Sequence, residues 1–297
     1  MKRPGRPPVF AALAAAAWLG ACAAPDAPGS PATPSPGPAR VAALIAGEYA
    51  GRPEVTDEPG TTGPLVRLTA AIEARNGPAV ALRLSQRSGD SRPRDFRMVL
   101  RPTRVSTRLE GQFSPLGPDG EPSGACPLEV SLQSDGFVAR TDAQTCRFGE
   151  GRDAVALVKE IAGDGRRLVI ADRVVDAATG EATSADRILE LHRVREFEGW
   201  AGIRDTPGAP WRMTETVRIA SDGVPVRPSG AGDMRLGIEL ELAPYRIARD
   251  QASLLRLRVF DVESGELLGQ SWADPAATRI GLALPSVQVG LRLRGAR

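Results

Sequence analysis

The side chains best suited to acid–base chemistry in this 297-residue chain are a single histidine and a closely spaced pair of glutamates. His192 alternates with Leu191 and Val194 in a strand-like run, without a Gly-x-Ser-x-Gly turn nearby to supply a nucleophile. Glu196 and Glu198 would lie on one face of a strand, close enough to couple. Without a cleft, such a pair is an ordinary solvated face. We therefore expect structural or surface roles for all three residues.

Sugar and calcium binding can also be weighed from residue types. Trp200, Trp211 and Trp272 could offer flat rings to a sugar, but we expect them to be core or strand-face residues. The motif Asp-x-x-(Thr/Ser)-Gly-Glu occurs at 176–181 and 261–266 and has too few carboxylates for a calcium loop. We expect one hairpin turn used twice, capped by the aspartate, with the glycine at positive φ. No metal or other cofactor is expected.

The first 21 residues have the anatomy of a signal peptide. Three basic residues precede an uncharged, alanine-rich stretch, Val9–Ala21, which is shorter than the roughly 20 apolar residues that a transmembrane helix needs. The stretch closes with Leu-Gly-Ala-Cys, which resembles the lipobox of bacterial lipoproteins. We therefore expect cleavage before Cys22 and acylation of its thiol with diacylglycerol. The alternative is an ordinary signal peptide, cut near Ala24, whose removal takes Cys22 with it.

Residues 22–40 are expected to form a lipidated tether. Proline recurs among alanine, serine and glycine, a composition that favours extended polyproline II backbone of about 3 Å per residue. Two or three acyl chains, at roughly 0.8 kcal/mol per buried methylene, make membrane residence effectively permanent. Ala23, in place of an aspartate, favours the outer membrane in Gram-negative sorting. The expected location is the periplasmic face of the outer membrane, with the lipid as the membrane contact.

The charge balance gives no support to a nucleic-acid partner. Removing the three basic residues of the leader from 38 leaves 35, against 36 acidic residues, so the mature chain is close to neutral. Lys159 is the only lysine after the leader, and the other cations are arginines. About 255 residues follow the tether, enough for one large β domain or two smaller ones.

Cys126 and Cys146 form an even pair once Cys22 carries lipid. Two strand-like runs, 127–133 and 137–141, lie between them and are joined by Ser-Asp-Gly, a hairpin signal. A symmetric hairpin would bring both sulfurs to its open end, where a disulfide would stabilise the fold by roughly 3 kcal/mol. Two buried free thiols are one alternative. A metal site is the other, and the single histidine and the lack of Cys-x-x-Cys disfavour it.

Alternation of polar and apolar residues dominates the folded region and predicts a mainly β fold. One face of each strand would be buried and the other solvated, as in antiparallel sheets. Residues 39–49 have helical spacing before glycines weaken it, which predicts a short helix leading into strands. The expected strands are 65–75, 79–87, 95–101, 154–161, 167–175 and 187–194, followed by 211–220, 234–242, 254–261, 267–273, 279–284 and 287–294.

A set of short motifs in the first part of the folded region has a spacing shared with a known family. Ala-Ala-Leu-Ile-Ala-Gly-Glu-Tyr at 42–49 looks like a helix-to-first-strand opening. Gly-Ala-Cys at 124–126, Gly-Phe-Val-Ala at 136–139 and Thr-Cys-Arg-Phe at 145–148 add Gly-Cys, Gly-Phe and Cys-Arg pairs. Over roughly residues 41–196 the chain resembles the CpcT/CpeT chromophore lyase family.

The sequence also departs from that family. Arg-Asp-Phe-Arg-Met-Val at 94–99 stands where the family tends to have Tyr-Arg-Gln-Arg, with Phe96 for tyrosine and Met98 for arginine. The resemblance implies a calyx-like antiparallel β-barrel, attachment of a bilin to a phycobiliprotein cysteine, and ligand contacts from Arg94, Phe96 and Arg97. The altered motif and the envelope address weaken the catalytic implication, and a shared fold does not fix function.

These observations predict a barrel followed by a smaller, sandwich-like all-β unit. Glu-Gly-Trp-Ala-Gly and Thr-Pro-Gly-Ala-Pro mark the expected junction. The expected segments are a signal peptide at 1–21, a lipidated tether at 22–40, a barrel at 41–197 and a C-terminal β unit at 198–297.

The expected function is binding without catalysis. A closed barrel of about eight to ten strands can hold one small ligand. We therefore expect an envelope lipoprotein that binds either a small apolar or pigment-like ligand or a partner protein. An interior filled by side chains would favour the partner protein. The alternative from the family resemblance is a bilin lyase-like enzyme.

Overall fold

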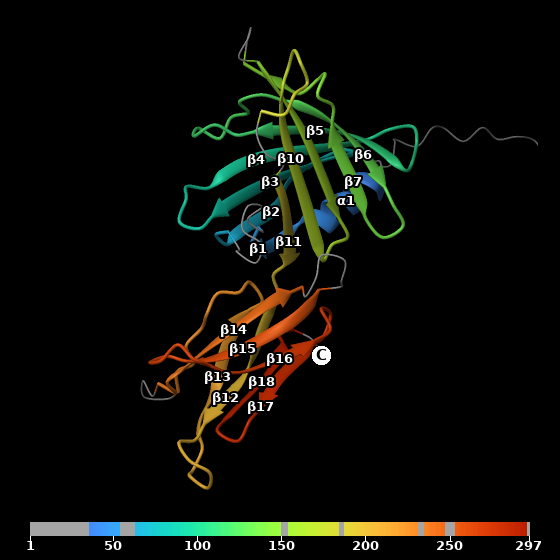
Figure 1. The fold of residues 1–297 in the computed structure, drawn as a ribbon. Coiled ribbons are helices and arrows are strands. Elements are labelled where there is room, and N and C mark those ends of the chain that lie inside the picture. Colours follow the sequence, from blue (N-terminus) through green and yellow to red (C-terminus); the bar gives the residue numbers. More distant parts are fainter. Residues whose placement is uncertain are drawn as a thin grey trace, which may run out of the picture. The chain divides into compact units, whose positions relative to one another are not determined.

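The computed structural model describes residues 36–53, 63–149, 154–183, 187–230, 235–246 and 253–295. Within them the chain forms an antiparallel β-barrel followed by smaller antiparallel sheets, as the alternation predicts (Figure 1). The expected signal peptide and Cys22 lie outside the described residues. Among the residues described, no helix is long and apolar enough to cross a membrane.

The barrel strands are β1 (Gly47–Gly51), β2 (Val66–Asn76), β3 (Ala79–Ser88), β4 (Arg94–Pro102), β5 (Arg108–Pro115), β6 (Cys126–Leu132), β7 (Phe137–Thr141), β9 (Val155–Gly163), β10 (Arg167–Asp176) and β11 (Arg187–Arg193). A short strand, β8 (Arg147–Phe148), pairs with β9. Strands β1 to β7 pair in sequence order, and β11 returns to β1. Because β9 pairs with both β7 and β10, the sheet closes on itself as a ring of ten strands.

A helix, α1 (Pro36–Ile45), precedes β1 and packs against the barrel. Val41, Ala42 and Ile45 are fully buried and belong to the barrel's hydrophobic core. Arg40 donates hydrogen bonds to two carbonyl oxygens in the β6–β7 turn, at 3.0 and 2.6 Å. The helix is therefore part of the folded domain.

The predicted tether thus extends too far, because the helix begins before Arg40. Pro36 and Pro38 lie in the first helical turn, where backbone N–H groups have no partner within the helix and proline is tolerated. A proline-rich composition is consistent with both a tether and such a helix start. The helix also ends earlier than predicted, because Gly47, with φ of +140°, opens β1.

The C-terminal unit has two sheets and its own hydrophobic core. Phe197, Leu240 and Leu257 are fully buried in that core. The first sheet contains β12 (Glu196–Ile203), β13 (Arg212–Ala220), β17 (Arg279–Ala283) and β18 (Val287–Leu293), in the order β13-β12-β18-β17. The second contains β14 (Ile238–Tyr245), β15 (Leu254–Asp261) and β16 (Leu267–Ala273).

The junction between the two units lies before the expected residue 198. β11 ends at Arg193 and β12 begins at Glu196, so Glu-Gly-Trp-Ala-Gly forms the middle of a strand and not a linker. Gly199 has no room for a side chain, because a Cβ would lie 1.9 Å from the carbonyl oxygen of Gly290 on β18. The glycine reflects close approach of two strands.

Candidate functional site

The described interior of the barrel is filled by the protein's own side chains. Leu68, Leu82 and Met98 are fully buried in one hydrophobic cluster that includes α1. Phe96 stacks on Phe113 in the same cluster, with ring centroids 5.1 Å apart. Close-packed side chains of this size take the space that a small ligand would occupy in a barrel of ten strands.

One charged pair lies among these apolar side chains. The Lys159 ammonium forms an ion pair with Asp172 on the neighbouring strand and lies 5.0 Å from the centre of the Phe113 ring. The side chain of Lys159 is 8% exposed. A buried charge is stable when it is paired. The Asp172 side chain is 35% exposed, so the pair joins a buried ammonium to a carboxylate that reaches solvent and leaves no free amine.

A disulfide joins Cys126 to Cys146, with Cα atoms 4.7 Å apart. β6 and β7 form the predicted hairpin. Beyond β7, the N–H groups of Thr145 and Cys146 donate hydrogen bonds to the Asp142 carbonyl, and this turn returns the chain to the start of β6. Both cysteines are buried. The hairpin argument thus predicts the pair correctly, although Cys146 follows a turn and does not lie on β7.

The three residues marked by the family resemblance do not converge on one site. Phe96 points into the barrel, where it stacks on Phe113. Arg97 lies on the outer face of β4 and forms an ion pair with Glu73 at 3.1 Å. Arg94 is exposed at the start of the strand. Successive residues of a strand point to opposite faces, so the motif is divided between core and surface.

Arg97 lines a groove of about 460 Å³ on the outer face of the barrel, across β2 to β5. Alanines from β2 and β3 line one side, and longer side chains from β4 and β5 line the other. The lining residues are Ala74, Asn76, Ala79, Ala81, Arg97, Val99, Arg101, Gln112, Ser114 and Pro122.

Strand register explains why the surface is hollowed there. Ala74, Ala81, Val99 and Gln112 lie side by side across the four strands. The two methyl side chains leave a trough beside the longer ones. A bulge in β2 places Ala74 opposite Ala81; in an unbroken register, Glu73 would hold that position. The bulge therefore removes Glu73 from the lining, although its carboxylate still forms an ion pair with Arg97 at 3.1 Å.

The groove is basic. Its lining contains two arginines and no carboxylate. Arg101 forms no ion pair with any described residue, and Arg97 has Glu73 as its one carboxylate neighbour at 3.1 Å. Strands β2 to β4 together carry seven arginines and two acidic residues. Three of these seven arginines are in ion pairs: Arg67 with Asp222, Arg83 with Asp95 and Arg97 with Glu73. The strands therefore carry a moderate excess of positive charge, although the chain as a whole is near neutral.

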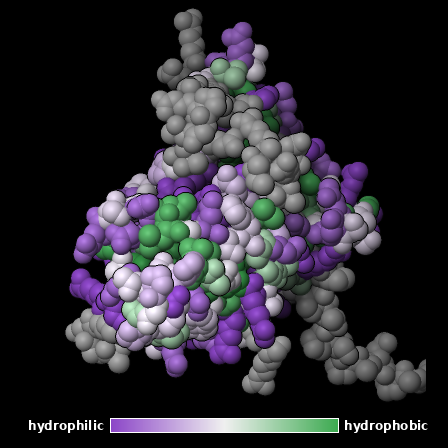
Figure 2. Space-filling view, turned by 60° about the horizontal axis from the view of Figure 1, so that its bottom comes forward, coloured by the Kyte–Doolittle hydropathy of each residue, from purple (hydrophilic) through white to green (hydrophobic). Residues whose placement is uncertain are grey.

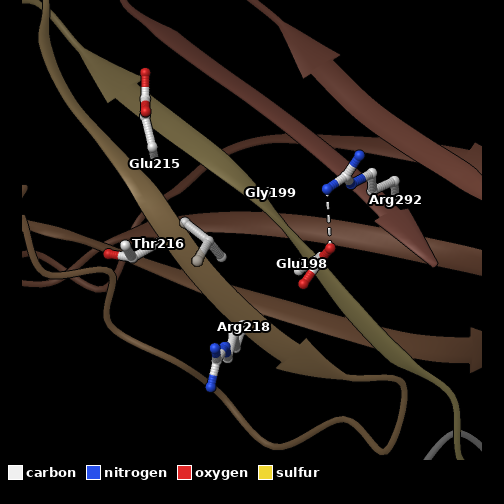
Figure 3. A pocket seen from close by; sticks show the side chains of 7 residues that line it. Glu198, Gly199, Glu215, Thr216, Arg218 and Arg292 are labelled. Atoms are coloured by element: carbon white, nitrogen blue, oxygen red, sulfur yellow. Dashed lines mark hydrogen bonds and ion pairs between the residues drawn. The ribbon is translucent and has the colours of Figure 1, made fainter. Parts of the chain in front are cut away.

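A second hollow, also of about 460 Å³, lies on the C-terminal unit. Figure 3 shows Glu215 and Arg218 on β13 pointing away from each other, and Glu198 paired with Arg292 at 3.0 Å. Positive and negative side chains are balanced in its lining. The hollow therefore has less preference for a ligand of either charge than the groove on the barrel.

The histidine lies in a surface ion cluster. His192 Nε2 is 3.4 Å from Glu190 Oε1, and Arg167 approaches the same oxygen at 3.6 Å. Burial acts to raise the pKa of Glu190, but the hydrogen bond from His192 and the nearby arginines outweigh it, so this pKa lies below its usual value. Glu196 is exposed on β12.

The three tryptophans named above lie on strand faces or beside loops of the C-terminal unit. Trp200 lies against Gly290, where a Cβ would fall 2.6 Å from its Nε1. Trp272 is 47% exposed, and Trp211 packs under the Arg204 guanidinium at 4.8 Å. On the face drawn in Figure 2, hydrophobic side chains gather among hydrophilic ones.

The repeated Asp-x-x-(Thr/Ser)-Gly-Glu motif forms the same turn twice. The Asp176 carboxylate accepts hydrogen bonds from the backbone N–H groups of the second and third residues after it, and Asp261 does the same. Gly180 and Gly265 take φ of +74° and +70°. These bonds hold the pKa of each aspartate below its usual value. The predicted turn chemistry is confirmed.

Comparison with known proteins supplies no relative. No family model matches this chain, and no curated protein matches it.

Proposed function

We propose that this chain is an envelope-anchored lipoprotein whose folded part binds a partner protein on its outer surface, without catalysis. The signal sequence and Cys22 support the address. A partner protein is favoured over a small ligand inside the barrel, because α1 and the inward side chains fill the described interior. That packing is the observation that carries the proposal.

The outer surface of the barrel has a groove that could hold part of a partner protein. The groove across β2 to β5 combines an apolar floor with hydrogen-bond donors from Arg97, Arg101 and Gln112. Such a mixture suits a polypeptide, which brings both apolar and charged side chains to an interface. The bilin lyase alternative has no comparable support, because Arg94, Phe96 and Arg97 lie apart.

The address is tested by labelling with radioactive palmitate in a Gram-negative host. We expect label in the wild-type chain, recovery in the outer-membrane fraction, and loss of both in Cys22→Ser. Substitution of the exposed residue Ser91, as Ser91→Ala, serves as the control and should leave both unchanged. An unlabelled product that still begins with Met1 would refute the proposed anchoring.

A further inference from the structure

We infer that the outer groove binds an extended acidic segment of the partner, with two carboxylates four residues apart flanking an apolar residue. The inference deepens the proposed function and rests on it. Arg97 and Arg101 are the cationic ends of the site, and Val99 lies between them on the same face of β4.

The spacing comes from strand geometry. Residues four apart on one strand lie about 13 Å apart and point to the same face. An extended peptide repeats at the same interval, so acidic side chains at positions i and i+4 can face Arg97 and Arg101 together. Position i+2 then faces Val99 and the alanine floor, Ala79 and Ala81, where an apolar side chain removes water from an apolar surface.

The charges on the groove favour this occupant. Arg101 has no ion pair with a described residue, whereas Arg97 keeps its ion pair with Glu73, which the bulge displaces from the lining. Glu110 lies opposite Arg101 on β5, but it does not line the groove and forms no ion pair there with a described residue. Guanidinium groups recognise carboxylates through charge-assisted hydrogen bonds, and at Arg97 an incoming carboxylate shares the guanidinium with Glu73.

Strand addition is not an alternative mode here. Strands β2 to β5 are each paired on both sides. A peptide on this face must therefore bind through side chains lying over the sheet, and not through backbone pairing at an edge. Affinity then depends on the two arginines and on the trough that separates them.

The test uses the whole lipidated chain in detergent and a fluorescent peptide containing Glu-Thr-Val-Thr-Glu between serines. We expect saturable binding that weakens as ionic strength rises from about 0.01 M to about 1 M, because the Debye length falls from about 30 to about 3 Å. Arg97→Ala and Arg101→Ala combined should lower the affinity about tenfold. Arg87 lies on the outer face of β3 but does not line the groove. Arg87→Ala should therefore change the peptide affinity by less than about twofold, as expected for the loss of one exposed charge.

A second peptide, Glu-Val-Glu-Thr-Thr between the same serines, has the same composition and charge with a different spacing. Weaker binding of this peptide supports the register. Equal binding of both peptides, equal losses in Arg87→Ala and the double variant, or no saturable binding would overturn the inference. If inorganic phosphate bound more tightly than the peptide and displaced it fully, the groove would be a site for a small anion, and the inference would also be overturned.

The two proposals fail in different ways. Peptide binding without palmitate label would remove the proposed address and leave the groove's specificity intact. Palmitate label without peptide binding would remove the groove's assignment and leave the anchored lipoprotein. Circular dichroism of each variant shows whether the barrel is still folded.

Discussion

The Arg83–Asp95 ion pair is one source of pH-dependent stability on the barrel. Arg83 donates a hydrogen bond to Asp95 at 2.7 Å, and this bond holds the pKa of the carboxyl below its usual value. The folded state therefore releases this proton more readily than the unfolded chain. The resulting stability is present above the unfolded pKa of about 3.9 and is lost as pH falls through the lower folded pKa.

We expect Asp95→Asn to lose stability at neutral pH, by at most about 1 kcal/mol because the pair is partly exposed. Between about pH 5 and about pH 2 the free energy of unfolding should fall less steeply for this variant than for the wild type. Urea denaturation across this range measures both slopes. Asp90→Asn, in the turn before β4, is the matched control and should follow the wild type. Identical slopes for Asp95→Asn would contradict the role given to this pair.

Gly265 tests the repeated turn. Its φ of +70° is unfavourable for a residue with a Cβ, yet nothing lies within 4 Å of where that Cβ would be. Gly265→Ala should therefore cost about 1 kcal/mol through backbone conformation alone. Gly180→Ala should cost the same, because the turn and its open surroundings are the same. Thermal unfolding measures the stability of both variants. If Gly265→Ala were as stable as the wild type, the turn could not have the backbone conformation described here.

At the scale of elements, the disulfide stabilises the β6–β7 hairpin. Replacing Cys126 and Cys146 together by alanine should lower the free energy of unfolding by about 3 kcal/mol, because the unfolded chain loses the constraint of a closed loop. Reductant should destabilise the wild type by a similar amount and leave the double variant unchanged. A wild type insensitive to reductant, with free thiols by Ellman titration, would contradict the pairing.

Helix α1 should behave as part of the barrel core. Ile45→Ala removes a fully buried side chain and should cost about 2–4 kcal/mol, measured by urea denaturation. Ala43→Ser, on the exposed side of the same helix, should change stability by less than about 0.5 kcal/mol. Equal effects of the two substitutions would mean that the helix does not pack on the barrel.

Most elements could be predicted from alternation, and two of the exceptions, β5 and β12, contain a glycine that long-range packing requires. β5 escaped prediction because its inward face runs Leu109, Gly111, Phe113, and the glycine interrupts the apolar pattern. A Cβ at Gly111 would lie 2.9 Å from the Cβ of Leu128. In β12, Gly199 made the segment resemble a linker. In both strands the glycine is required by the close approach of a residue far away in sequence, and no local sequence pattern reveals that approach.

The candidate site was only partly predictable. The family resemblance named Arg97, but the groove depends on alanines from two other strands and on a bulge that shifts Ala74 into line with Ala81. Arg101 carried no local signal beyond its charge. Which residues share an outer face follows from pairing across four strands, and that register is a long-range property.

At the scale of the whole molecule, closure of the barrel links these features. The β9–β10 pairing joins the ends of the sheet, and the inward side chains then fill the ring. On the barrel itself, the outer face of the sheet remains available, and Arg97 and Arg101 lie on it. A filled interior leaves the outer face of the barrel as the surface for the proposed partner.

Native mass spectrometry of the mature protein from its own host tests this claim most directly. We expect a colourless species without a bound small molecule, with the mass of the chain from Cys22 onward plus acyl groups if the proposed lipidation also holds. A pigment or other apolar adduct that is released only when the barrel unfolds would contradict it, because the interior would then be a ligand cup.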